Sequence, residues 1–125
     1  MGVADTDPMA VVEAWDRALR AGDWDTARAA LADDATYVTL NDEGTSCTNA
    51  EQIVGLMRSW KGTVPDVEVV EWETIGSGVL AHLRQPAWDD ATWFQFLTVE
   101  GGLIRRLEDH PTREMALAAM GDVEA

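Results

Sequence analysis

The stretch VVEAWDRALRAGDWDTARAALADDATYV, residues 11–38, predicts two helices followed by a strand. Asp7 precedes the first helix as its cap, and apolar residues then recur at helical spacing until Gly22 interrupts the pattern. A shorter run from Trp24 to Ala32 predicts a second helix, which pairs with the first as a hairpin. The next run, Ala35 to Leu40, is rich in β-branched and aromatic residues and predicts a strand.

The rest of the chain changes from helical to strand patterning. A turn is expected at Asn41–Gly44, and a capping box at Thr48–Glu51 opens a third helix that ends near Gly62. From Asp66 onward the apolar period is two, which predicts the first of four successive strands. The three further strands are expected at Val79–Gln85, Thr92–Val99 and Leu103–Asp109. A last helix is then expected from Pro111 to Gly121.

These elements predict one α+β domain spanning residues 1–125, with flexible tails at 1–6 and 122–125. Because the late strands follow one another as a meander, we expect an antiparallel sheet with the three helices of the N-terminal half on one face. Aromatic side chains from the second half either fill the volume inside a bent sheet or line a pocket there. They are Trp60, Trp72, Trp88, Trp93, Phe94 and Phe96.

The chain has 125 residues, with 23 acidic against 9 basic side chains and a net charge of −14. No basic stripe is available to neutralise phosphates or anionic headgroups, so we expect neither nucleic acid nor a membrane as a partner. Met1–Asp7 lacks a signal pattern, and the single cysteine, Cys47, cannot pair within the chain, which together favour the cytoplasm. Two histidines far apart in sequence and no phosphate-cradling glycine motif predict no metal site and no cofactor.

Residues 11–38, the ending EGGLIRRLED at residues 100–109 and the order of elements resemble the nuclear transport factor 2-like superfamily. Within it, the chain is most similar to the ketosteroid isomerase, SnoaL-like polyketide cyclase and limonene epoxide hydrolase branches. The resemblance covers nearly the whole chain. It implies a strongly curved, cone-shaped sheet around a pocket for a small apolar molecule, and we expect a homodimer through the sheet.

The resemblance to ketosteroid isomerase leaves that reaction incomplete. The family's tyrosine on the first helix aligns with Trp15, its base on the first strand with Thr39, and its protonated acid with Gln95. Gln95 can still donate a hydrogen bond to a carbonyl, but no enolate-forming base stands opposite it. Steroid isomerisation by that route is therefore rejected.

The resemblance to limonene epoxide hydrolase retains two positions. The family's first-strand tyrosine aligns with Tyr37 and its final-strand acid with Glu108. Its asparagine becomes Thr39, its arginine is matched loosely by Arg84, and its second acid falls near Pro86. The triad that activates water is therefore broken. Polyketide cyclases of the superfamily also use an acid late in the last strand, which keeps Glu108 as a candidate for proton transfer.

Two criteria disagree about the face on which Glu108 lies. Strand alternation places Glu108 with Arg106 and His110, and places Leu107 and Asp109 on the opposite face. The family alignment puts the first set in the pocket, whereas the apolar Leu107 favours the second. We follow the alignment and expect burial to raise the pKa of Glu108 toward neutrality. The alternative is that Arg106 pairs with Glu108 and keeps it ionised.

We therefore expect a cofactor-independent enzyme that performs acid–base chemistry on a small, largely apolar molecule. The candidate catalytic residues are Glu108, Tyr37, Arg106 and His110. The candidate substrate-binding residues are Trp15, Thr39, Trp60, Trp93 and Gln95. The alternative is a non-catalytic domain of the same fold that binds a ligand or dimerises.

Overall fold

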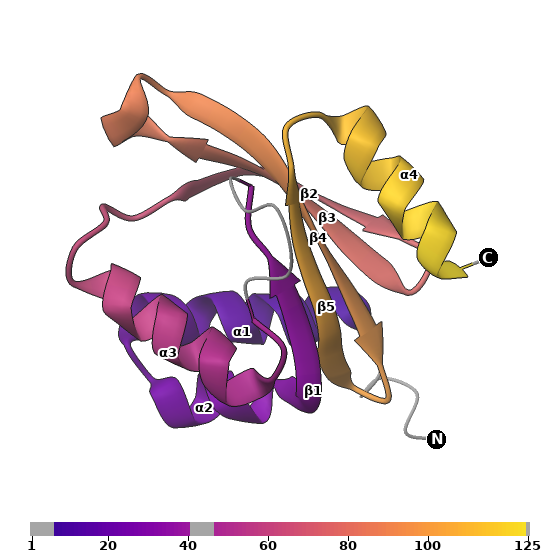
Figure 1. The fold of residues 1–125 in the computed structure, drawn as a ribbon, viewed down its shortest axis with the longest axis horizontal. Helices are drawn as coiled ribbons and strands as arrows, with labels where there is room; N and C mark the ends of the chain where they lie inside the picture. The colour runs from indigo at the N-terminus through magenta and orange to yellow at the C-terminus, as the bar shows by residue number, and fades with distance from the viewer. Residues whose placement is uncertain (1–6, 41–46, 125) are drawn as a thin grey trace.

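A five-stranded mixed sheet with helices on both faces forms the protein (Figure 1). The structure, a computed structural model, describes residues 7–40 and 47–124. The elements are α1 (Pro8–Ala21), α2 (Trp24–Ala29), β1 (Leu31–Val38), α3 (Ala50–Lys61), β2 (Glu68–Ile75), β3 (Gly78–Gln85), β4 (Ala91–Glu100), β5 (Leu103–His110) and α4 (Arg113–Glu124), with a short 3-10 turn at Pro86–Trp88. This composition confirms the predicted α+β class.

The strands lie in the order β1-β5-β4-β3-β2. Strands β2 to β5 form the predicted antiparallel meander, but β1 pairs with β5 in parallel. The prediction of a wholly antiparallel sheet is therefore wrong, because the last strand of the meander returns beside β1 in the direction of β1. The sheet is open, with β1 and β2 at its edges, and the cone shape stays a prediction.

The two faces of the sheet carry two separate hydrophobic clusters. The first lies between the sheet and helices α1 to α3, where Val79, Leu97 and Leu107 meet Val12 and Ile53. The second lies on the opposite face, under α4, and contains Leu80, Phe96, Ala116 and Met120. Alternate residues of each strand therefore enter different environments, and strand parity decides which side chains reach which face.

Helix α1 matches its prediction. The Asp7 carboxylate accepts a hydrogen bond from the Met9 amide at 3.2 Å, and Pro8 occupies the first helical turn. Gly22 ends the helix in the left-handed conformation, with φ of 73°, which glycine adopts without the strain a side chain would bring.

Helix α2 is shorter than predicted, ending at Ala29 instead of Ala32, and β1 begins already at Leu31. Leu31 pairs with Ile104 of β5, and the Ile104 amide donates to the Ala30 carbonyl at 2.9 Å. Pairing with β5 thus overrides the local helical pattern. The strand in turn ends at Val38, before the predicted Leu40, and the turn expected at Asn41–Gly44 lies outside the described residues.

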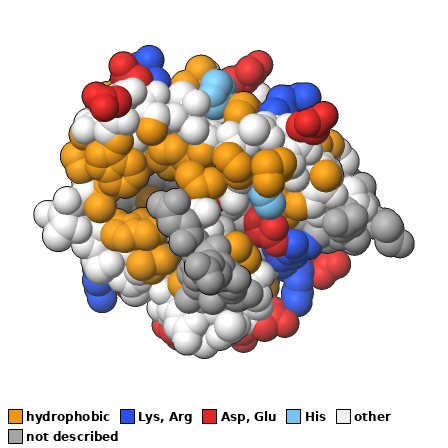
Figure 2. Space-filling view, turned by 45° about the horizontal axis from the view of Figure 1, so that its top comes forward, with side chains coloured by type: hydrophobic (Ala, Val, Ile, Leu, Met, Phe, Trp, Pro, Cys, Tyr) orange, Lys and Arg blue, Asp and Glu red, His pale blue; other side chains and the backbone are white. Residues whose placement is uncertain are grey.

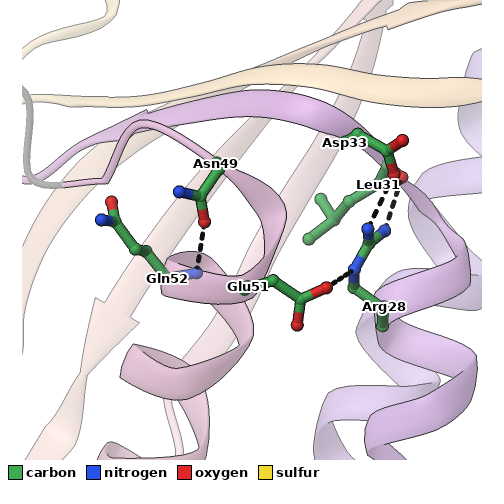
Figure 3. Close-up of polar contacts among 6 residues, drawn as sticks. All are labelled: Arg28, Leu31, Asp33, Asn49, Glu51 and Gln52. Atoms are coloured by element: carbon green, nitrogen blue, oxygen red, sulfur yellow. Dashed lines mark hydrogen bonds and ion pairs between the residues drawn. The ribbon is translucent and has the colours of Figure 1, made fainter.

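Arg28 fixes the α2–β1 junction against α3 (Figure 3). Its guanidinium donates to Asp33 of β1 and to Glu51 of α3, both at 2.7 Å, and to the Leu31 carbonyl at 3.3 Å. Both carboxylates are largely exposed, so each ion pair alone contributes little. Together they hold the ends of three elements in one geometry.

The ends of the two remaining helices differ from their predictions. Asn49, instead of Thr48, caps α3: its side chain accepts from the Gln52 amide at 2.9 Å, as Figure 3 shows. Helix α4 begins at Arg113 and passes through Gly121 to Glu124, since a single glycine costs only about 1 kcal/mol in a helix. None of the helices that the structure describes has the length and apolar character needed to span a membrane.

Candidate functional site

A cavity of about 150 Å³ lies between the sheet and the N-terminal helices. Its wall is mainly aromatic and aliphatic, with Tyr37 and Gln95 as polar members on the strands. Figure 2 shows hydrophobic side chains gathered around a hollow on the face it displays. Strand and helix residues of the wall include Val12, Trp15, Leu19, Trp60, Val69, Trp72, Ala81, Leu83, Trp93 and Leu97.

Strand register brings Tyr37, Gln95 and Asp109 together on this face. Tyr37 of β1 lies opposite Leu107 of β5, two residues before Asp109, and Gln95 of β4 lies directly opposite Asp109. The Tyr37 hydroxyl donates to Asp109 Oδ2 at 2.8 Å, and Gln95 Nε2 donates to Asp109 Oδ1 at 2.9 Å. One carboxylate is thus held by two side chains that both line the cavity.

The environment of Asp109 makes it a group that exchanges protons near neutral pH. Burial raises its pKa from 3.8 to about 6, although the hydrogen bonds from Gln95, Tyr37 and the Leu40 backbone and the charge of His110 oppose the rise. Burial, together with the negative charge of Asp109, raises the pKa of Tyr37 well above its usual range. The phenol therefore keeps its proton while the carboxylate titrates.

Glu108 lies on the opposite face of β5, so its predicted place in the pocket is wrong. It pairs in register with Phe96, which belongs to the cluster under α4. Arg106 forms an ion pair with Glu108, as the alternative expectation held, and His110 Nε2 lies 3.2 Å from its other oxygen. The Arg106 guanidinium and the His110 ring also lie against Phe96, at 5.3 and 5.8 Å from its ring centre.

The same parity places the remaining predicted residues. Trp15, Trp60, Trp93 and Gln95 line the cavity with Tyr37. Thr39 lines a neighbouring hollow of about 450 Å³, with Cys47, Gln52, Leu56 and Trp60.

On β3, Ala81 and Leu83 line the cavity. His82 and Arg84 take the other face: His82 stacks on Phe94 at 4.4 Å, and Arg84 binds Glu68. Arg84 therefore stands apart from Tyr37, with which the epoxide hydrolase alignment had grouped it.

Asp109 is the residue that the sequence reasoning missed. The signal was Leu107: a leucine on a strand favours the covered face, and Asp109, two residues on, shares its face. In the structure Leu107 is fully buried in the main cluster. A distant alignment cannot resolve a shift of one residue, and such a shift exchanges the two faces of a strand.

Among the described residues, no three His, Cys, Asp or Glu side chains are grouped closely enough to hold a metal ion. The tyrosine and amide of the site donate hydrogen bonds to its carboxyl group. Side chains of these three kinds can donate and accept hydrogen bonds.

Comparison with known proteins finds likeness only at the level of structure. No protein-family model matches the chain, and no curated protein matches it in sequence. An LEH-like epoxide hydrolase from M. tuberculosis superposes with a TM-score of 0.67 at 24% identity, covering 84% of this chain and 82% of that one. A proposed polyketide cyclase from Sinorhizobium meliloti gives 0.67 at 19% identity, covering 80% and 93%.

An NTF2-like protein from Burkholderia xenovorans gives a TM-score of 0.63 at 17% identity, covering 82% of this chain and 87% of that one. The chain therefore has the NTF2-like fold that its sequence predicted. Identities this low establish the fold alone, because one fold supports many unrelated activities. Any function must be argued from the site.

Proposed function

We propose that the protein is a cofactor-independent acid–base enzyme that transfers a proton to and from a small, largely apolar molecule in the 150 Å³ cavity. The observation that carries the proposal is the hydrogen bond from Tyr37, which lines the cavity, to Asp109, whose pKa burial raises to about 6. A base with that pKa is ionised at pH 7 and still basic enough to accept a proton. Epoxide hydrolase and polyketide cyclase chemistry among proteins of similar fold supports the same class.

The proton passes through the Tyr37 hydroxyl. Because its own pKa is so high, Tyr37 cannot lose a proton first, so it accepts one from the ligand as it gives its own to Asp109 Oδ2. Gln95 orients the carboxylate by its bond to Oδ1. A carboxylate has about four acceptor positions, and Tyr37, Gln95 and the Leu40 backbone occupy three.

The proposal is tested with single-ring ligands that fit the cavity. The readouts are exchange of the α-hydrogens of cyclohexanone with D₂O, isomerisation of 3-cyclohexen-1-one to its conjugated isomer, and hydrolysis of cyclohexene oxide. We expect Asp109→Asn and Tyr37→Phe each to lower the rate at least 100-fold, the usual scale of general acid–base catalysis. NMR follows all three reactions.

Glu108→Gln is the matched control, because it removes the neighbouring carboxylate from the opposite face of the same strand. We expect this variant to keep the wild-type rate. Loss of activity in Glu108→Gln with retention in Asp109→Asn would assign the proton transfer to Glu108. Equal rates in all variants would refute proton transfer through Tyr37 to Asp109.

Ligand binding without turnover is the second candidate function. It is favoured by the hydrogen bonds that Tyr37 and Gln95 donate to Asp109, which already engage both oxygens of the carboxylate. Titration calorimetry of the same single-ring ligands identifies it: saturable binding with no exchange, isomerisation or hydrolysis supports a binding domain. The homodimer expected from the sequence stays a prediction, to be measured by sedimentation.

A further inference from the structure

Three hollows meet around the indole of Trp60, in the last turn of α3. One is the inner cavity of about 150 Å³. A second, of about 160 Å³, lies outside it between α1 and the segment that follows α3, and the third is the hollow of about 450 Å³ beside Thr39. Among the described lining residues, Trp60 is common to all three.

The indole is held in place from the side of the site. Trp60 is partly buried and packs against the main hydrophobic cluster. It meets the ring of Tyr37 edge to face, with ring centres 6.4 Å apart and planes at 82°. The same Tyr37 donates to Asp109, so the indole stands between the hydrogen-bonded group and the two outer hollows.

Volume determines what the inner cavity accepts while Trp60 stays in this position. An apolar cavity of about 150 Å³ in another protein binds benzene, so the inner cavity has room for about one ring with small substituents. Two fused rings exceed this space. Trp60 is the one described side chain that borders all three hollows, and their volumes together are several times that of the inner cavity.

We propose that Trp60 is the specificity-determining residue of the site: it partitions one large pocket into three and restricts the inner cavity to single-ring molecules. The inference deepens the proposed function by assigning its size class of ligand. The inference depends on the proposed function only in calling the ligand a substrate. The size limit applies equally to a ligand that is bound and not converted.

The test measures binding of phenol, 2-naphthol and 1-hydroxypyrene by titration calorimetry, in the Asp109→Asn background so that no turnover is needed. With Trp60 present, we expect saturable binding of phenol and at least ten-fold weaker binding of 2-naphthol. Trp60→Ala is expected to bind all three, because the merged space admits four rings. Trp60→Phe should again bind 1-hydroxypyrene much more weakly than Trp60→Ala does.

Trp72→Ala is the matched control, because of the three hollows Trp72 lines only the inner cavity. It enlarges that cavity by one indole without joining it to the others, so 2-naphthol should enter and 1-hydroxypyrene should not. Trp24→Ala, which lines only the outer hollow of 160 Å³, should leave the size limit unchanged.

An identical size limit in Trp60→Ala and Trp72→Ala would overturn the partition, as would binding of 1-hydroxypyrene to the parent protein as tight as that of phenol. Circular dichroism checks that each variant is folded, and Trp60→Leu replaces Trp60→Ala where the alanine variant is not. A shift in size limit with no turnover in the wild-type protein would sink the proposed enzyme while leaving the partition intact.

Discussion

The Tyr37 hydroxyl lies 2.8 Å from Asp109 Oδ2, although 72 positions separate the two residues in the chain. The parallel pairing of β1 with β5 creates this contact, since it sets Tyr37 beside Leu107 and on the face of Asp109. A carboxylate held there is desolvated and still able to titrate at about pH 6. The consequences for pH, charge and packing can each be measured.

Asp109→Asn should change how stability depends on pH. Because the folded state holds the Asp109 proton more tightly than the unfolded chain, this carboxyl stabilises the fold fully below about pH 4, and that contribution is lost as pH rises through about 6. A pKa rise of about two units corresponds to about 3 kcal/mol. Asparagine does not titrate, so relative to wild type the variant should gain about 3 kcal/mol between pH 4 and pH 8.

Urea unfolding of both proteins at pH 4, 5, 6 and 8 gives this difference directly. The other acidic side chains titrate in both proteins, so their contribution cancels in the difference between the two free energies of unfolding. A stability difference that stays constant across this range would contradict the assigned environment of Asp109.

Gln95→Glu should raise the pKa of Asp109 further. The substitution keeps the shape of the side chain but replaces a donor 2.9 Å from Asp109 Oδ1 with a second carboxylate. Two carboxyls this close share a proton, so one of the pair should titrate about one to two units above the wild-type value. Carbon-13 NMR of the labelled carboxyl follows the titration and requires no activity.

Gln52→Glu is the charge-matched control for this measurement. Gln52 accepts from the Thr48 amide at 2.7 Å at the start of α3, where a glutamate makes the same bond. The variant adds one negative charge away from Asp109 and should leave its titration unchanged. An equal shift in both variants would point to overall charge as the cause, instead of contact.

Gly78→Ala should destabilise the protein through the packing of α4. A Cβ at this buried position would lie 2.8 Å from Cε of Met120 and 3.0 Å from the Leu97 carbonyl oxygen. Overpacking of this kind costs about 1 to 3 kcal/mol. Thermal unfolding measures the loss.

Met120→Ala, combined with Gly78→Ala, separates the two contacts. Removing the methionine relieves the side-chain clash but not the backbone one, so the double variant should lose less than the sum of the two single changes. Strict additivity would show that Met120 does not pack on Gly78, and would contradict the position of α4 on this face.

Much of the fold follows from local sequence patterns. The structure confirms the predictions that depend only on residues close together in the chain. The cap at Asp7 and the end of α1 at Gly22 are examples. The end of α2 could not be predicted in this way, because Leu31 continues the helical period and becomes a strand residue only by pairing with Ile104.

The candidate site was predicted in part. Tyr37 and Gln95 were identified from the sequence, and both line the cavity beside Trp15, Trp60 and Trp93. The acid was assigned to the wrong face, since Glu108 and Asp109 are adjacent and only the covered side of β5 distinguishes them. The catalytic roles of Tyr37 and Asp109 stay predictions, which the variants proposed above would test.

The sequence by itself determined where helices and strands occur, the period of the strands and an acidic chain of the α+β class, because caps, turns and side-chain periodicity act between near neighbours. Only the tertiary structure decided that β1 runs parallel to β5 and that Asp109, not Glu108, meets Tyr37. The physical reason is that burial and hydrogen bonding of a carboxylate depend on side chains from β1, β4 and β5. Their distance in space is set by sheet pairing and not by their distance along the chain.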